Sequence, residues 1–138
     1  MARALLDTDT FSEIIKAKNA VLMRKAREYR QQFGRYTIST VTLVEMVKGL
    51  QKRGREDRIQ DLVTRLTNEE LLPLDRDAAV IAGRIYGELE KSGRTIGRAD
   101  PLIAGIALEN NLTLVTGNTR HFERIVTLGF PLLLADWR

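Results

Sequence analysis

The sequence of 138 residues contains no cysteine, one histidine, three prolines and only 6% aromatic residues. Without cysteine there is no disulfide framework and no cysteine nucleophile, and one histidine cannot build a Cys/His zinc site. No apolar run approaches the roughly 18 residues of a membrane helix, and Met1–Leu6 is too short for the core of a signal peptide. We therefore expect one domain (residues 1–138) that acts in the cytoplasm without contacting a membrane.

The charge of the chain is mildly basic and dominated by arginine. There are 22 Lys+Arg against 18 Asp+Glu, and 16 of the basic residues are Arg. The planar guanidinium fork suits phosphate, so the bias favours an anionic partner, although an arginine-rich surface without special function explains it equally well. A hydrophobic content of 43% is typical of a folded chain rather than a disordered one.

Short apolar segments alternate with longer amphipathic ones along the chain. The apolar segments predict strands at Ala4–Leu6, Tyr36–Ile38, Leu71–Leu74, Leu112–Val115 and Leu132–Leu134. Helical spacing predicts helices over Asn19–Phe33, Val41–Leu50, Arg55–Leu66, Ala78–Lys91 and Pro101–Asn110. Strands joined by helical crossovers form parallel sheets. The predicted fold class is α/β, with a central, mostly parallel five-stranded sheet and helices on both faces.

Polar residues follow the predicted strands at the edge where open parallel sheets bind ligands. Asp7 follows the first strand, and Glu45 lies in the helix after the second. Asp100 opens the helix that leads into the fourth strand, and Asn118 follows that strand. Residues 93–97, with glycine at both ends, predict a flexible approach to Asp100.

Each acid also has an ordinary structural explanation. Asp7 and Asp9 can cap the first helix, and Glu45 completes a capping-box pattern that begins three residues earlier. Asp100 directly precedes a proline, as an N-cap residue often does. Asp75 has the same local setting after the third strand and is interpreted as a cap only.

If Asp7, Glu45 and Asp100 converge, they cannot all stay ionised unaided. Two carboxylates about 4 Å apart repel by roughly 4 kcal/mol at an effective dielectric constant of about 20. Such a cluster holds either a proton or a cation. Oxygen donors favour a hard ion, Mg²⁺ or Mn²⁺, which can also bind phosphate oxygens and activate water for phosphodiester hydrolysis.

Four segments in order give the chain a resemblance to a known family. They are Leu5 to Thr10 (LLDTDT), Ile38 to Glu45 (ISTVTLVE) followed by Gly49, Asp100 to Ala107 (DPLIAGIA), and Leu114 to Ile125 (LVTGNTRHFERI). With the ending Ala135 to Trp137, they resemble the PIN-domain ribonucleases of the VapC toxin type, from bacterial toxin–antitoxin pairs. The match spans nearly the whole chain.

The resemblance implies that Asp7, Glu45 and Asp100 are catalytic and form the family's acidic triad around one or two Mg²⁺ or Mn²⁺ ions. Asn118 is assigned to the same site, where many members have a fourth acid, so a second ion would be held less well. Asp9 stands where the family mostly has Asn; we interpret it as a helix cap, with added charge near the metal as the alternative. The implied activity is an endoribonuclease that cuts structured RNA, possibly a tRNA anticodon loop, and leaves a 5′-phosphate and a 3′-hydroxyl.

Basic side chains are the expected RNA contacts. The assigned residues are Lys16, Arg24, Arg27 and Arg120. The first three belong to a basic strip between Lys16 and Arg35, which could follow phosphates or simply be a solvated helix face. The resemblance further implies a homodimer and a complex with a small VapB-type antitoxin that covers the cleft.

Two other functions remain open on the sequence. The segment from Asp7 to Thr10 also fits the Asp-x-Asp-x-Thr signature of haloacid-dehalogenase-like phosphatases, with Asp7 as the nucleophile and Asp9 as the general acid. The later Gly-Asp pair of that family is missing, however, and Glu45 would have no role. The other alternative, motivated by Asn118, is a catalytically inert PIN module that binds RNA or a partner.

Overall fold

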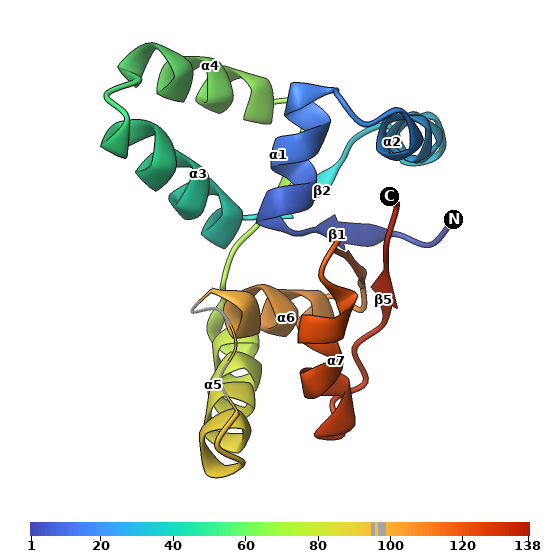
Figure 1. Ribbon diagram of the computed structural model, residues 1–138, viewed down its shortest axis with the longest axis vertical. Coiled ribbons are helices and arrows are strands. Elements are labelled where there is room, and N and C mark those ends of the chain that lie inside the picture. Colours follow the sequence, from blue (N-terminus) through green and yellow to red (C-terminus); the bar gives the residue numbers. More distant parts are fainter. Residues whose placement is uncertain (95, 97–98) are drawn as a thin grey trace.

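A computed structural model of the chain describes residues 1–94, 96 and 99–138 (Figure 1). Its elements are β1 (Ala4–Leu6), α1 (Thr8–Lys16), α2 (Ala20–Phe33), β2 (Thr37–Ser39), α3 (Thr40–Lys52), α4 (Glu56–Leu66), β3 (Glu70–Leu72), α5 (Arg76–Lys91), α6 (Asp100–Glu109), β4 (Thr113–Val115), α7 (Thr119–Thr127) and β5 (Leu134–Ala135). The predicted strands and helices are all present, with ends shifted by no more than two residues. Two further helices had no predicted bounds: α1, expected only as the first helix that Asp7 could cap, and α7. No helix in the described part of the chain is long and apolar enough to cross a membrane.

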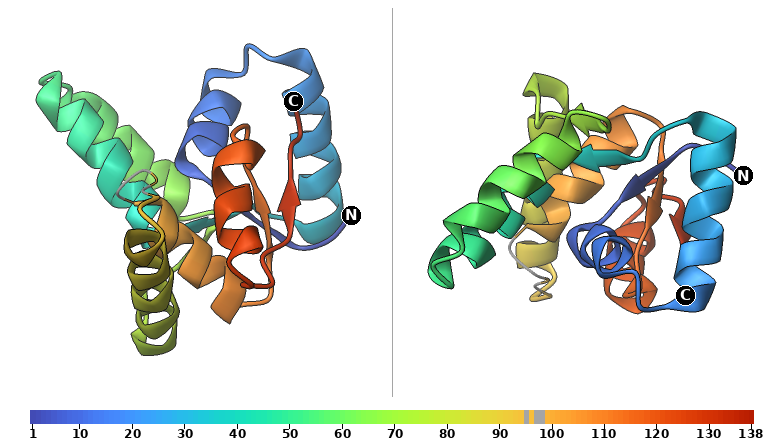
Figure 2. Two further views of the ribbon diagram at one scale, coloured as in Figure 1. Left: turned by 60° about the horizontal axis from the view of Figure 1, so that its bottom comes forward. Right: turned by 90° about the horizontal axis from the view of Figure 1, so that it is seen from above.

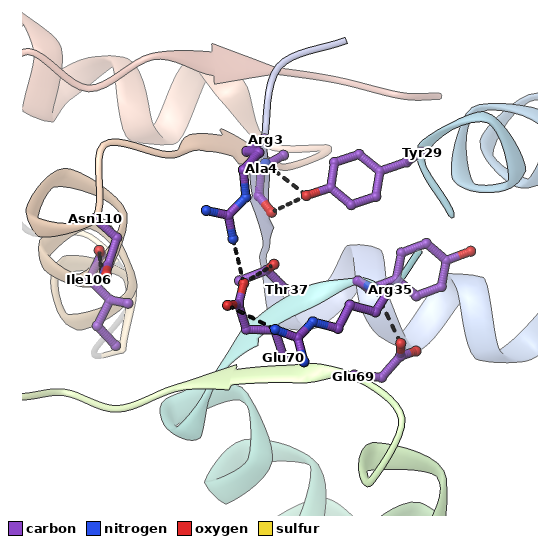
Figure 3. Close-up of polar contacts among 10 residues, drawn as sticks. Arg3, Ala4, Tyr29, Arg35, Thr37, Glu69, Glu70, Ile106 and Asn110 are labelled. Carbon is purple, nitrogen blue, oxygen red and sulfur yellow. Dashed lines mark hydrogen bonds and ion pairs between the residues drawn. The ribbon is translucent and has the colours of Figure 1, made fainter. Parts of the chain in front are cut away.

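All strand pairs are parallel, which confirms the predicted class, but the ladders form two groups. One sheet has the order β1-β4-β5 and the other pairs β2 with β3, whereas a single five-stranded sheet was predicted. Strands β1 and β2 are nevertheless neighbours. One side-chain contact connects the two groups near the amino ends of the strands: Glu70 of β3 accepts a hydrogen bond from Arg3, which precedes β1, at 2.7 Å, and it also accepts one from Thr37 of its own sheet at 2.7 Å (Figure 3).

Helices cover both faces of the strands, and the alternation of strand side chains explains how. Ala4 and Leu6 of β1 belong to one hydrophobic core together with residues of α1, α2 and α4. Leu5 belongs to a second core, which contains residues of α5, α6 and α7. In β4, Leu114 joins the second core and Val115 the first. Figure 1 shows these two helical layers above and below the strands.

The first core contains a buried polar cluster. Glu69 is only 8% exposed, and its side chain accepts hydrogen bonds from Arg30 at 2.6 Å and from the Tyr36 backbone N–H at 3.2 Å. The Arg30 guanidinium lies 4.1 Å from the centre of the Tyr36 ring. The buried Tyr29 hydroxyl exchanges hydrogen bonds with the backbone of Ala4 (Figure 3), so this side chain belongs to the packed core.

The contact between α5 and α6 depends on a glycine. A Cβ atom added at Gly105 would lie 2.7 Å from the carbonyl oxygen of Ala78 and 3.1 Å from the Cβ of Ala82. Because the first of these contacts is with backbone, neither helix can give way without moving as a whole.

We expect Gly105→Ala to lower the free energy of unfolding by about 2 kcal/mol, since the added methyl group forces the two helices apart. Gly83→Ala is the matched control, because Gly83 lies in α5 with open space around it. Removing a helical glycine there should raise stability by about 0.5–1 kcal/mol. Urea unfolding of both variants checks the prediction, and equal effects at the two positions would contradict it.

Candidate active site

Asp7 lies directly after β1, where its backbone continues the pairing with β4 and its side chain caps α1. Its backbone N–H donates to the carbonyl oxygen of Val115 at 3.0 Å, and its Oδ1 accepts from the backbone N–H of Thr10 at 2.8 Å. Asp7 is therefore the N-cap of α1, as the structural explanation predicted. Burial raises the pKa of Asp7 above its ordinary value, and hydrogen bonds from Thr10 and Thr116 oppose this shift.

Glu45 projects from the second turn of α3 and takes no part in capping. Ser39 caps this helix by accepting a hydrogen bond from the backbone N–H of Thr42 at 3.1 Å, so the capping-box interpretation is wrong. Instead, the hydroxyl of Thr8 donates a short hydrogen bond to Glu45 Oε1 and lies 3.0 Å from the Thr42 hydroxyl. These hydroxyls join α1 to α3 and fix the Glu45 carboxylate, whose charge acts on Asp100.

Asp100 is the first residue of α6, and its side chain does not cap the helix. Ala99 occupies the N-cap position without a side-chain hydrogen bond, so the cap interpretation of Asp100 is wrong as well. Its Oδ2 lies 3.1 Å from Nδ1 of His121, at the start of α7. Of the predicted flexible approach at 93–97, residues 95 and 97 lie outside the described part of the chain.

Electrostatics places the acids in one cluster. Burial, followed by the negative charges of Asp7, Glu45 and Asp9, raises the pKa of Asp100 to about 6. Asp9 is an exposed residue in the first turn of α1 and not its cap, so its interpretation as the cap is wrong and its charge adds to the cluster. Asn118 precedes α7 and lines a pocket together with Asp7 and Asp9.

Asp75 serves as an internal comparison. Its side chain accepts a hydrogen bond from the backbone N–H of Ala78 at 2.9 Å and caps α5, as predicted. It does not contribute to the raised pKa of Asp100. The same local sequence setting therefore gives a plain cap at Asp75 and a member of a charge cluster at Asp7.

The donor set fits a hard divalent cation. The cluster offers carboxylate and amide oxygens, and the mutual repulsion that acts on Asp100 is the energy that a cation would relieve. In residues 1–94, 96 and 99–138, no three Asp, Glu or His side chains lie close enough to enclose an ion together. An ion bound here would therefore keep part of its water shell, as Mg²⁺ does at sites with one or two carboxylates.

A groove of about 660 Å³ extends from the cluster along α1, α3 and α4. Thr8, Asp9 and Glu45 line its acidic end, and apolar side chains such as Met46 and Leu62 form part of its wall. Basic residues also line it: Lys16, Arg53, Arg55, Arg58 and Arg65. Figures 1 and 2 show that α3 and α4 pair as an arm that projects from the body of the molecule.

The predicted RNA contacts fall into different surroundings. Lys16 lines both the groove and the pocket beside Asp7. Arg24 and Arg27 are exposed on α2 and line neither, and Arg120 is exposed in the first turn of α7. The arginines of α4 were missed, although the charged face opposite the apolar stripe of the predicted helix was a signal that could have found them.

The raised pKa of Asp100 predicts a pH-dependent stability. Because this pKa lies near 6 in the folded protein and near 3.8 ordinarily, folding favours the protonated acid. The resulting stabilisation is complete below about pH 4 and is lost as the pH rises through about 6. Without a divalent ion, Asp100→Asn should therefore be more stable than the unmodified protein by about 2 kcal/mol at pH 7.5 but not at pH 4.

Urea unfolding in EDTA at the two pH values measures this difference. Repeating the urea unfolding in excess Mg²⁺ should reduce the stability difference in favour of Asp100→Asn. The reason is that the ion stabilises the complete set of carboxylates, which only the unmodified protein has. A stability difference that is independent of pH would contradict the prediction.

Known proteins resemble this chain in sequence and in fold. The PIN domain family model matches residues 4–128. The tRNA(fMet)-specific endonuclease VapC of Shigella flexneri is 36% identical over 129 residues, which cover 91% of this chain and 93% of that protein. The protein of the same name from Salmonella typhimurium is 34% identical over 141 residues, 99% of both chains.

Two solved structures give the same result. The crystal structure of DNA-bound VapBC from Salmonella typhimurium contains a chain that is 33% identical, with a TM-score of 0.81 and 100% of both chains covered. VapBC2 of Rickettsia felis, bound to a DNA fragment from its promoter, contains a chain that is 28% identical, with a TM-score of 0.81 and 98% of both chains covered.

Proposed function

The chain belongs to the PIN domain family, among the VapC ribonucleases of toxin–antitoxin systems, and from this premise we propose that it cuts structured RNA with the Asp7, Glu45 and Asp100 cluster. The single observation that carries the proposal is this cluster, in which Asp100 is buried and repelled by the other acids. Nucleases with a PIN domain generally depend on divalent metal ions. We propose Mg²⁺, with Mn²⁺ as its substitute, because both favour oxygen donors.

The roles of the side chains follow from their positions. Asp7 and Asp100 would hold the ion, and His121 would orient the Asp100 carboxylate through the 3.1 Å contact. When bound, the ion supplies Lewis acidity that activates water and neutralises charge on the phosphate. Glu45, which accepts a hydrogen bond from Thr8, would orient the attacking water and accept its proton. Asn118 adds a neutral acceptor at the edge of the site.

The substrate and partners are also part of the proposal. Relatives at 34–36% identity are named for tRNA(fMet), so initiator tRNA is the first substrate to test. Lys16 and the arginines of the groove would hold phosphates along the path to the acids. Because the structural neighbours are VapBC complexes, we propose a cognate VapB-type antitoxin, a homodimeric toxin and action in the cytoplasm, where tRNA is found.

One experiment tests the ribonuclease against both alternatives. The purified protein is incubated with initiator tRNA and, separately, with a small phosphomonoester, in Mg²⁺ and in EDTA. We expect tRNA fragments with 5′-phosphate ends in Mg²⁺ only, and no monoester hydrolysis. Family membership already removes the basis for the haloacid-dehalogenase interpretation, which required an unrelated fold.

Two results would overturn the proposal. Monoester hydrolysis without tRNA cleavage would show that the acidic cluster does not act as a ribonuclease site. Binding of tRNA without cleavage in either ion, Mg²⁺ or Mn²⁺, would identify an inert PIN module. Expression of the chain without an antitoxin provides a test in cells, where growth arrest is expected and harmless expression would contradict a toxin.

A further inference from the structure

A second pocket, of about 330 Å³, lies beside Asp7 on the side away from α3. Asp7, Asn118 and Gly117 line it together with two cations, Lys16 and Arg138. Arg138 does not line the groove along α1, α3 and α4, and it is not a member of the acidic cluster.

Arg138 is held in a fixed position by contacts at both ends. Its Nε donates to Glu13 Oε2 at 2.7 Å, and its backbone N–H donates to Asp136 Oδ1 at 2.9 Å. The Asp136 carboxylate is also 3.5 Å from Nη1. The side chain is 22% exposed, so the guanidinium is ordered at the wall of the pocket but still reaches its interior.

Because Gly117 has no side chain, the Arg138 guanidinium occupies the space where a Cβ atom would lie, and we call this space the seat of Arg138. A Cβ atom added there would lie 2.0 Å from Nη1 and 2.3 Å from Cζ of Arg138. Gly117 has no unusual backbone angle that would require glycine. The missing side chain therefore allows the guanidinium to lie close to the Gly117 backbone.

The charges of the pocket make anion binding conditional. Four carboxylates, Asp7, Asp9 and Glu13 of the lining and Asp136 beside Arg138, face two cations, which leaves a net charge of −2 before any metal ion binds. The charge of Asp7 also acts on Arg138. A divalent ion at Asp7 would bring this balance to zero, so the pocket would stop repelling a phosphate group only when the ion is present.

We propose that Arg138 and Lys16 form a subsite for a phosphate group of the RNA backbone next to the acidic cluster, which makes Arg138 a substrate-positioning residue. The inference rests on the proposed ribonuclease function. Glu13 occupies the Nε edge of the guanidinium, and the η nitrogens provide further donors for phosphate oxygens in a planar fork. A phosphate fixed on this side would hold the neighbouring bond in line with the acids.

The test compares three variants in binding to fluorescein-labelled initiator tRNA by anisotropy, with Ca²⁺ as the probe ion and with EDTA. Arg138→Gln removes the charge, and Gly117→Ala keeps the charge but fills the seat. Arg84→Gln is the matched control, because Arg84 is an exposed arginine of α5 that lines neither cavity. A gel confirms that the RNA stays intact, and melting temperatures confirm folding.

In Ca²⁺, we expect Arg138→Gln to weaken binding about tenfold and to lower the slope of log Kd against log salt by about 1. Gly117→Ala should weaken binding at least about threefold, and Arg84→Gln less than about twofold. In EDTA the variants should all bind like the unmodified protein. If Arg138 only anchored the end of the chain, Arg138→Gln would lower the melting temperature, and its effect on RNA affinity would be the same in Ca²⁺ and in EDTA.

Three outcomes are decisive. If Arg138→Gln binds like Arg84→Gln in Ca²⁺, or loses as much affinity in EDTA as in Ca²⁺, the subsite is wrong. If the unmodified protein cuts tRNA in Mg²⁺ while Arg138→Gln is unaffected, the subsite fails and the ribonuclease stands. If the unmodified protein neither binds nor cuts tRNA, both proposals fail together.

Discussion

Asp100→Asn is expected to lower the rate of Mg²⁺-dependent RNA cleavage by at least about 1,000-fold, which corresponds to about 4 kcal/mol of transition-state stabilisation. The substitution keeps the size of the side chain and an oxygen that can accept from His121 at 3.1 Å. It removes the negative charge that Asp7 and Glu45 repel and that would hold a divalent cation in the proposed site. The measurement is single-turnover cleavage of labelled tRNA over a range of Mg²⁺ concentrations.

Asp75→Asn is the matched control for this experiment. Asp75 also follows a strand and begins a helix, but it only caps α5, and Asn caps as well as Asp. Cleavage by this variant should stay within about twofold of the unmodified protein. Asp100→Asn should nevertheless melt at a higher temperature than the unmodified protein in EDTA, so loss of activity through unfolding can be recognised. Full activity of Asp100→Asn would exclude the acidic cluster as the catalytic site.

Glu69→Ala is expected to lower the free energy of unfolding by about 3 kcal/mol. The Glu69 side chain is 3% exposed, and its removal leaves the buried Tyr36 N–H without its acceptor and Arg30 without its counter-charge. The side chain of Arg30 is 42% exposed, so water can satisfy it in part and the loss stays below that of a fully buried pair. Chemical unfolding at pH 7 in excess Mg²⁺ measures the effect.

Glu70→Ala is the matched comparison for Glu69→Ala, because the ion pairs of Glu70 are exposed to solvent and that of Glu69 is largely buried. Glu70 is the next residue, and its ion pairs with Arg3 and Arg35 involve arginine side chains that are more than half exposed. We expect a loss of about 1 kcal/mol at this position. Equal losses at Glu69 and Glu70 would show that burial does not control the strength of these pairs.

The sequence was sufficient for the fold because the strands are short, apolar and separated by helices of regular period. The triplet Ala4–Leu6 serves two cores at once, which is why it reads as continuously apolar rather than alternating. The division into two sheets was not predictable in this way. It depends on contacts between distant residues, such as the one between Arg3 and Glu70, that no local pattern contains.

The site was predictable only as a set of acids at strand ends. Local patterns gave the correct cap at Asp75 and at Asp7 but the wrong one at Glu45 and Asp100. At Glu45 the deciding partner is Thr8, 37 residues away in the chain. The seat of Arg138 on Gly117 was equally hidden, because it joins the close of the chain to the loop after β4.

The order of the strands has a consequence for protein synthesis. Strand β4 lies between β1 and β5, so β1 has no hydrogen-bonded neighbour until residues 113–115 have left the ribosome. Asp7 and Glu45 are made early, but Asp100 reaches them only with the second core. A nascent chain thus carries two of the three acids of the proposed site before the third can join them, so the cluster is complete only after β4 has paired with β1.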